Sequence, residues 1–193
     1  MKAKFKVKTF IKTLIFLLIL SAIIMVLIQV LINLKPVNSV KYRGLLFVFR
    51  DNVKAAERIP VYPNDKMLGN MFWDYKIQNI SILFKPEQQY IGRYQANFFE
   101  LAYKLTAIYK TSYPIIFEKN INASEIESFD NITREDGVLK IVYIPPTYAN
   151  ETIIKVSSNR IYVYAKTDRD MDLATMKIIL SVMDYAGNYT YLN

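Results

Sequence analysis

An uncharged apolar run from Leu14 to Leu34 is the feature that most limits what this chain can form. It has twenty-one residues, of which three are polar and none is charged. At about 1.5 Å per residue in a helix, the run reaches roughly 31 Å, which matches the hydrocarbon core of a bilayer. A cleaved signal peptide has a shorter apolar region and a small-residue cleavage site, and neither feature is present here. We therefore expect an uncleaved transmembrane anchor over residues 13–34.

Basic residues are distributed unevenly around this run. Five Lys and no acidic residue precede it, whereas three basic residues follow it between positions 35 and 43. The positive-inside rule then places the N-terminus in the cytoplasm and the rest of the chain outside. We expect a basic cytoplasmic segment over residues 1–12, a tether over residues 35–43 and one extracytoplasmic domain over residues 44–193. The predicted protein is a single-pass protein of the cell membrane.

Sequons of the form Asn-x-Ser/Thr support an exterior location independently. Five occur, all after the apolar run, whereas fourteen Asn and nineteen Ser plus Thr predict about one or two by chance. The alternative is that an Asn-rich chain acquires such triplets without carrying sugar. The candidate glycosylation sites are Asn79, Asn122, Asn131, Asn150 and Asn188.

Composition excludes several classes of function. The chain contains neither Cys nor His, so disulfides, Cys or His metal sites, thiol nucleophiles and Ser-His-Asp relays are all excluded. The five Gly are scattered singly, which excludes a phosphate-binding glycine loop, and we expect no cofactor. The net charge of +8 falls to +3 once the five N-terminal Lys are removed, so nucleic-acid binding is not indicated.

Hydrophobic patterning predicts an α/β domain with a mixed sheet that helices cover on at least one face. Pro60 and Pro63 bracket an extended piece, and Asn64 or Asp65 can cap the helix that follows. The predicted strands are 45–50 (a buried strand), 77–85, 114–119, 138–144, 152–156 and 161–165, and the predicted helices are 64–73, 93–110 and 171–184.

The predicted helix over residues 93–110 is the clearest element. Apolar residues recur at spacings of three and four from Phe98 to Ile108, which predicts a core-facing stripe. Glu100 and Lys104 lie four residues apart, and we expect them to pair on the outer surface.

Aromatic residues are unusually abundant, with fifteen Tyr and eleven Phe. Phe99 and Tyr103 form a second apolar stripe on the helix over residues 93–110. We therefore expect this helix either to pack on two sides or to end in an interface. Exposed Tyr would favour contact with protein or sugar, although Tyr also fills the edges of cores. The interface candidates are Phe99, Tyr103, Tyr90 and Tyr94.

The order of these elements resembles the thioredoxin-like fold. The resemblance is carried by residues 80–110 (strand into long helix), residues 114–119, a proline at Pro145 or Pro146, the hairpin over residues 152–166 and residues 173–180.

This resemblance implies a cis proline at Pro145 or Pro146, and a helix within the polar loop over residues 120–136. The family places its CxxC between Lys85 and Ala96, where this chain has no Cys, so thiol chemistry is not carried over. What the resemblance implies is a Cys-less domain that acts as a peptide-binding or chaperone-like module.

Acidic residues at Asp168, Asp170 and Asp172 alternate as in a calcium-binding loop. Leu173 and Ile179 occupy the positions where an EF-hand-like loop needs Gly and Glu, so acidic capping of the last helix by Asp168 or Asp170 is favoured. Paired carboxylates can also hydrolyse glycosides. A second group of acids, Glu125, Glu127, Asp130, Glu135 and Asp136, lies in one predicted loop, where solvation is the simpler interpretation.

Two functional hypotheses follow. The first is a membrane-anchored extracytoplasmic binding or structural module in a cell-envelope or membrane complex, with the lipid bilayer and another protein as its partners. The alternative is a carboxylate-dependent envelope hydrolase or glycan-processing enzyme. An aromatic patch would favour the binding module, and a concave pocket with converging carboxylates would favour the enzyme.

Overall fold

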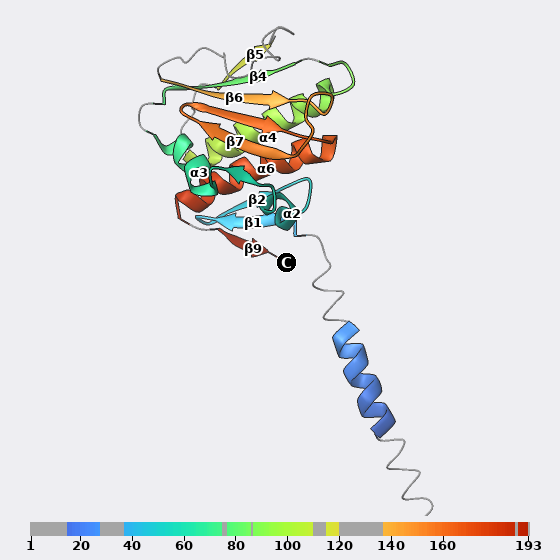
Figure 1. Ribbon diagram of the computed structural model, residues 1–193. Helices are drawn as coiled ribbons and strands as arrows, with labels where there is room; N and C mark the ends of the chain where they lie inside the picture. Colours follow the sequence, from blue (N-terminus) through green and yellow to red (C-terminus); the bar gives the residue numbers. More distant parts are fainter. Residues whose placement is uncertain are drawn as a thin grey trace, which may run out of the picture. The chain divides into compact units, whose positions relative to one another are not determined.

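The computed structural model describes residues 15–27, 37–74, 77–85, 87–109, 115–119 (backbone), 137–187 and 189–192. The chain divides into two compact units, residues 1–36 and residues 37–193. The first unit contains a helix over residues 15–27, whose large apolar side chains are exposed (Figure 1). None of the helices in the described residues reaches the length and hydropathy that a membrane crossing requires. The predicted anchor over residues 13–34 lies partly outside the described residues.

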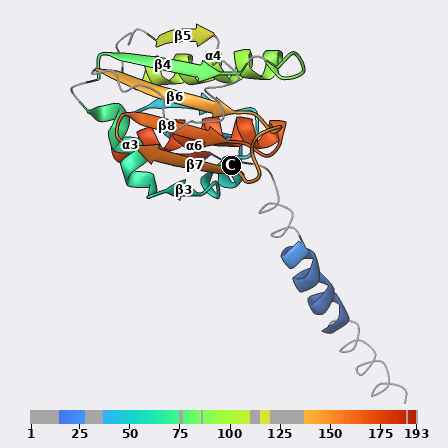
Figure 2. The same ribbon diagram turned by 45° about the horizontal axis from the view of Figure 1, so that its top comes forward.

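The second unit is built on a six-stranded mixed sheet with the order β3-β7-β8-β6-β4-β5 (Figures 1 and 2). β4, β5, β6 and β8 run parallel to one another, and β7 pairs with β8 antiparallel. The predicted α/β domain with a mixed sheet is therefore confirmed. The strands are β3 (Val61–Tyr62), β4 (Asn79–Phe84), β5 (Ile115–Lys119), β6 (Val138–Ile144), β7 (Ile153–Ser157) and β8 (Arg160–Tyr164).

Two long helices, α4 (Ile91–Tyr109) and α6 (Asp168–Tyr185), lie on the same face of this sheet (Figures 1 and 2). Their apolar side chains form one core with the strands and with the short helices α2 (Val53–Glu57) and α3 (Asp65–Trp73). All seven residues of β6 are buried, which explains why its sequence is an almost continuous apolar run.

Side-chain caps set where two helices begin. The Asn64 side chain accepts a hydrogen bond from the Met67 backbone N–H at 2.9 Å, which confirms Asn64 as the cap of α3. Thr167 caps α6 by accepting from the Asp170 N–H at 3.1 Å. The prediction that Asp168 or Asp170 caps this helix is therefore wrong, because both acids lie inside the first turn, where they face the positive end of the helix.

A second, antiparallel sheet was not predicted. It has the order β2-β1-β9, with β1 (Ser39–Tyr42), β2 (Leu45–Val48) and β9 (Thr190–Leu192), and Figure 1 shows it beyond α6 from the large sheet. β1 occupies much of the expected tether over residues 35–43. The Arg43-Gly44 turn explains this difference, because both residues have positive φ, as a tight hairpin requires.

The strand predicted over residues 45–50 is present as β2, but it is not buried. β2 lies at the edge of the small sheet, where Leu45, Leu46 and Val48 are exposed and Phe47 alone turns into the core. Composition indicated a buried strand because all four residues are apolar, and a position at a sheet edge cannot be read from apolar character.

Glu100 and Lys104 pair as predicted, but the expectation that they lie on the outer surface is wrong. Both side chains are buried and their charged groups are in direct contact. The Lys104 ammonium lies 3.9 Å from the ring centroid of Phe49, so the segment after β2 covers the pair. The core stripe from Phe98 to Ile108 is buried as predicted.

The cis peptide bond among the described residues precedes Pro63. Neither Pro145 nor Pro146 follows a cis bond, so the cis proline implied by the thioredoxin-like resemblance is absent at those positions. The loop over residues 120–136, which would have to hold a helix in that fold, lies outside the described residues. The resemblance itself stays a prediction.

Candidate functional site

An apolar groove of about 310 Å³ runs between the edge strand β2 and helix α4. Because β2 pairs with β1 and with no other described strand, its second backbone edge is open for pairing. The groove is lined by Leu45, Leu46, Phe47, Val48, Tyr103, Lys104 and Ala107.

Phe99 and Tyr103 stand on the exposed side of α4 next to this groove. Their exposed fractions are 70% and 65%, and their rings stack with centroids 6.2 Å apart and planes 8° apart. The two residues are one helical turn apart, so they form a continuous aromatic surface. The opposite side of α4 is packed into the core, which makes the helix a rigid platform for that surface.

A buried ionic cluster supports the groove from below. Burial lowers the pKa of Lys104, and its hydrogen bond to Glu100 opposes that shift. Arg50 adds a second cation, 3.6 Å from the Glu100 carboxylate. The Lys104 charge is paired with Glu100 and lies against Phe49, and most of the residues that line the groove are apolar.

The four predicted interface residues divide into two pairs. Phe99 and Tyr103 lie together on the surface, whereas Tyr94 is fully buried and Tyr90 is half-buried against the core. Tyr94 stacks on Phe98, and burial raises the pKa of its hydroxyl above the ordinary value. Tyr94 therefore contributes to the core and cannot contact a partner.

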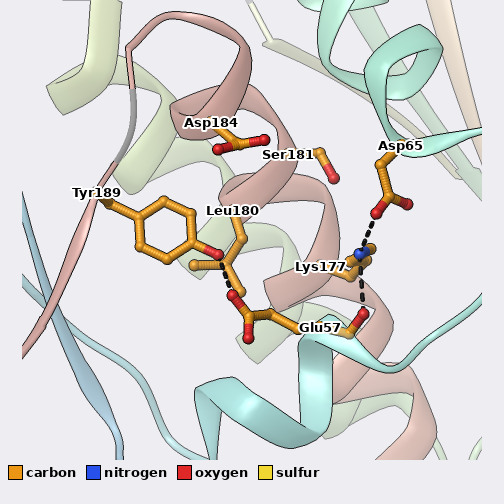
Figure 3. Close-up of a pocket in the computed structure, with 7 residues that line it drawn as sticks. All are labelled: Glu57, Asp65, Lys177, Leu180, Ser181, Asp184 and Tyr189. Carbon is orange, nitrogen blue, oxygen red and sulfur yellow. Dashed lines mark hydrogen bonds and ion pairs between the residues drawn. The ribbon is translucent and has the colours of Figure 1, made fainter.

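A polar pocket of about 250 Å³ lies where α2, α3, α6 and the segment before β9 meet (Figure 3). The buried Lys177 ammonium donates to the Asp65 carboxylate at 2.8 Å and to the Glu57 backbone carbonyl at 3.0 Å. Glu57 also accepts hydrogen bonds through its carboxylate from the hydroxyls of Tyr189 and Tyr191. Ser181 and Asp184 complete the polar wall.

The two tyrosines that donate to Glu57 keep their hydroxyl protons at all ordinary pH values. Burial, together with the neighbouring Glu57, raises the pKa of Tyr191 to about 12 and that of Tyr189 further. Among the groups that line the pocket, the Glu57 and Asp65 carboxylates already have partners, and Asp184 is exposed to solvent. The sequence offered no signal for this pocket, because its residues are separated by up to 132 positions.

The acids that suggested a calcium loop differ in burial, because Asp168 and Asp170 are half-buried in the first turn of α6. Asp172 is buried, and its carboxylate accepts from Arg93 at 2.7 Å. Burial raises the pKa of Asp172, and the neighbouring Arg93 and Asn97 oppose that rise. Across the described parts of the chain, no group of acidic side chains is arranged to hold a metal ion. The loop acids from Glu125 to Asp136 lie outside the described residues.

Two of the five sequon asparagines fall within the described residues. Asn150 is exposed in the loop between β6 and β7, whereas Asn79 is half-buried at the start of β4, and its sequon partner Ser81 is fully buried. Sugar attachment needs a surface position, which Asn150 provides. Asn122, Asn131 and Asn188 lie outside the described residues.

Comparison of the chain with protein-family models, with curated proteins and with solved structures finds no match.

Proposed function

We propose that this protein is a single-pass, membrane-anchored module whose extracytoplasmic α/β domain binds another protein of a membrane or cell-envelope complex. The anchor is the uncharged run from Leu14 to Leu34, and its N-terminal Lys flank orients the domain to the outside. The binding surface is the aromatic pair Phe99 and Tyr103 together with the open edge of β2.

The stacked, exposed pair of Phe99 and Tyr103 is the observation that carries this proposal. Large aromatic side chains are enriched at protein interfaces because they bury much area and lose little conformational entropy. Leu45, which is exposed and lies on the same face of β2 as Phe47, extends the apolar surface along this strand. This edge has none of the charged side chains or prolines that usually protect exposed strands, so pairing with another chain is physically favoured.

Site-specific photo-crosslinking in native membranes tests the surface. A photoreactive residue at position 103 of the full chain should give a discrete adduct with one protein, which mass spectrometry can identify. Tyr62 provides a matched control position, because it is also a tyrosine and its exposed fraction, 66%, is close to that of Tyr103. Adducts of equal yield at positions 62 and 103, or none at 103, would contradict the proposal.

Substitution separates binding from folding in the same system. Tyr103→Asp places a charge in the aromatic surface and should abolish co-purification of the crosslinked partner. Tyr62→Asp makes the same chemical change at equal exposure and should retain the partner. Both variants should unfold at the same temperature as the wild type, since neither side chain is buried.

A carboxylate-dependent hydrolase is the second candidate, and the polar pocket favours it. The pocket is concave, and Glu57, Asp65 and Asp184 line it. Glycoside hydrolysis needs one carboxyl as acid and another as base or nucleophile. Turnover of an envelope glycan that is lost in Glu57→Gln and retained in Tyr103→Asp would support this candidate over the binding module.

A further inference from the structure

We propose that the outer face of the small sheet β2-β1-β9 lies against the lipid headgroups of the membrane that holds the anchor. This inference rests on the anchor in the proposed function and assigns a second surface, distinct from the aromatic pair on α4. The occupant is the bilayer surface itself, because the face combines apolar and basic side chains and is joined to the anchor by a short chain.

Strand register determines which side chains share this outer face. Val48 and Leu192 both pair with Ser39, and Leu46 and Thr190 both pair with Lys41. The inner face carries Val40 and Phe47, which are buried in the core. The outer face therefore displays three exposed apolar residues, Leu46, Val48 and Leu192, around a small serine.

Charge on this face favours a lipid surface. Lys41 is exposed at the centre of the row between Leu46 and Thr190. β1, β2 and β9 contain no acidic residue. A lysine with an apolar stem can lie along Leu46 and place its ammonium among lipid phosphates, and anionic lipids strengthen that contact.

A second copy of the chain fits this face less well. Face-to-face packing around a two-fold axis would bring Lys41 towards the same lysine of the other copy. Because the face holds no acid, the two ammonium groups would lose water and gain no counter-charge. Headgroup phosphates supply that counter-charge.

Chain length places the face within reach of the bilayer. The predicted span ends at Leu34, and β1 begins at Ser39, five residues later. A fully extended chain of that length covers at most about 18 Å. The headgroup layer on one side of a bilayer is roughly 5–8 Å thick, so β1 must start close to it. Tethering raises the local concentration of the membrane surface, and a small apolar face is then sufficient for contact.

Spin-label accessibility tests this proposal with the full chain, which contains no Cys of its own. Single variants Leu46→Cys, Val48→Cys, Tyr62→Cys and Ile24→Cys are labelled with a nitroxide and reconstituted in vesicles of phosphatidylcholine and phosphatidylserine. Collision with oxygen reports a lipid environment, collision with a water-soluble nickel chelate reports an aqueous one, and low collision with both reports a protein contact. Position 24 tests the anchor, and position 62 is the exposed control.

We expect the labels at positions 24, 46 and 48 to collide mainly with oxygen, and the label at position 62 to collide mainly with the nickel chelate. Lys41→Glu should increase nickel collisions at position 46 severalfold, and omission of phosphatidylserine should act in the same direction. Aqueous or protein-like labels at 46 and 48, with a lipid-like label at 24, would overturn this inference and leave the anchor intact. An aqueous label at 24 would overturn both this inference and the proposed anchor.

Discussion

Gly69 of α3 lies directly against the backbone of α6 at Ser181. A Cβ atom at Gly69 would come within 2.4 Å of the Ser181 carbonyl oxygen and 2.7 Å of the Tyr185 Cβ. Real Cβ atoms do not approach other atoms so closely, and a helix backbone cannot move aside as a flexible side chain can. Because Gly69 has no Cβ, the two helices can pack this closely. The glycine also lowers the intrinsic helix propensity of α3.

Replacing Gly69 by Ala should destabilise the domain. The gain in helix propensity is about 1 kcal/mol, and overpacking against a fixed backbone costs about 3 kcal/mol, the upper end of the usual range. We expect a net loss of about 2 kcal/mol in the free energy of unfolding, measured by urea titration. Gly92→Ala is the matched control, because a Cβ at Gly92 meets nothing within 4 Å. An equal effect of the two substitutions would contradict the close approach of α3 and α6.

Lys177→Met should be more destabilising than Asp65→Asn. The Lys177 side chain is 6% exposed, and its ammonium makes two hydrogen bonds, so its removal leaves the Glu57 carbonyl without this donor. We expect a loss of about 2–3 kcal/mol for Lys177→Met. The Asp65 side chain is 57% exposed, so water and the new amide replace much of the contact, and the loss should be at most about 1 kcal/mol. Chemical denaturation of both variants tests this order.

Asp51→Asn should remove a part of the stability that depends on pH. The Asp51 carboxylate accepts two hydrogen bonds from Arg169, at 2.7 and 2.9 Å, and these lower its pKa below the ordinary value of 3.8. The contribution is therefore complete above pH 3.8 and is lost as pH falls through the folded-state pKa. Thermal unfolding should show the variant to be less stable than the wild type at neutral pH and equal to it in strong acid.

Asp172→Asn should change the pH dependence of stability in the direction opposite to that expected for Asp51→Asn. Burial raises the pKa of Asp172, so the folded state binds this proton more tightly than the unfolded state. Stability from this group is complete below the ordinary pKa of 3.8 and falls as pH rises through the folded-state pKa. Between these two pH values, the unfolding temperature of the variant should fall less with rising pH than the unfolding temperature of the wild type does. A steeper decline would contradict the burial of this carboxyl.

Glycan occupancy should differ between the two sequons that the structure describes. Asn150 is exposed in a loop and should carry sugar when the chain is made in a glycosylating compartment. Asn79 is half-buried at the start of β4 and should carry less. Glycopeptide mass spectrometry of the protein purified from its native membrane measures both sites. Occupancy at Asn79 that exceeds occupancy at Asn150 would contradict this expectation.

Local patterns in the sequence were sufficient to predict most elements of the large sheet and its helices. β6 was predicted with its observed bounds, because a run of seven residues, all apolar except Lys140, ends just before Pro145. The cap of α3 at Asn64 followed from the preference of Asn for that position. The stripe of α4 from Phe98 to Ile108 followed from its spacing. Each of these features depends on neighbours within a few residues, and such neighbours are visible in a sequence.

Distant contacts decided the rest. β1 pairs with β2 through a local hairpin, but its other neighbour in the sheet is β9, with Ser39 and Leu192 separated by 153 positions. Glu100 and Lys104 are buried only because Phe49 covers them, and Phe99 and Tyr103 are exposed because no described element packs on that side of α4. The sequence by itself therefore determined most elements of the large sheet, its two long helices and the apolar run of the predicted anchor. The tertiary structure alone decided which apolar residues remain on the surface, because burial depends on what packs against a side chain.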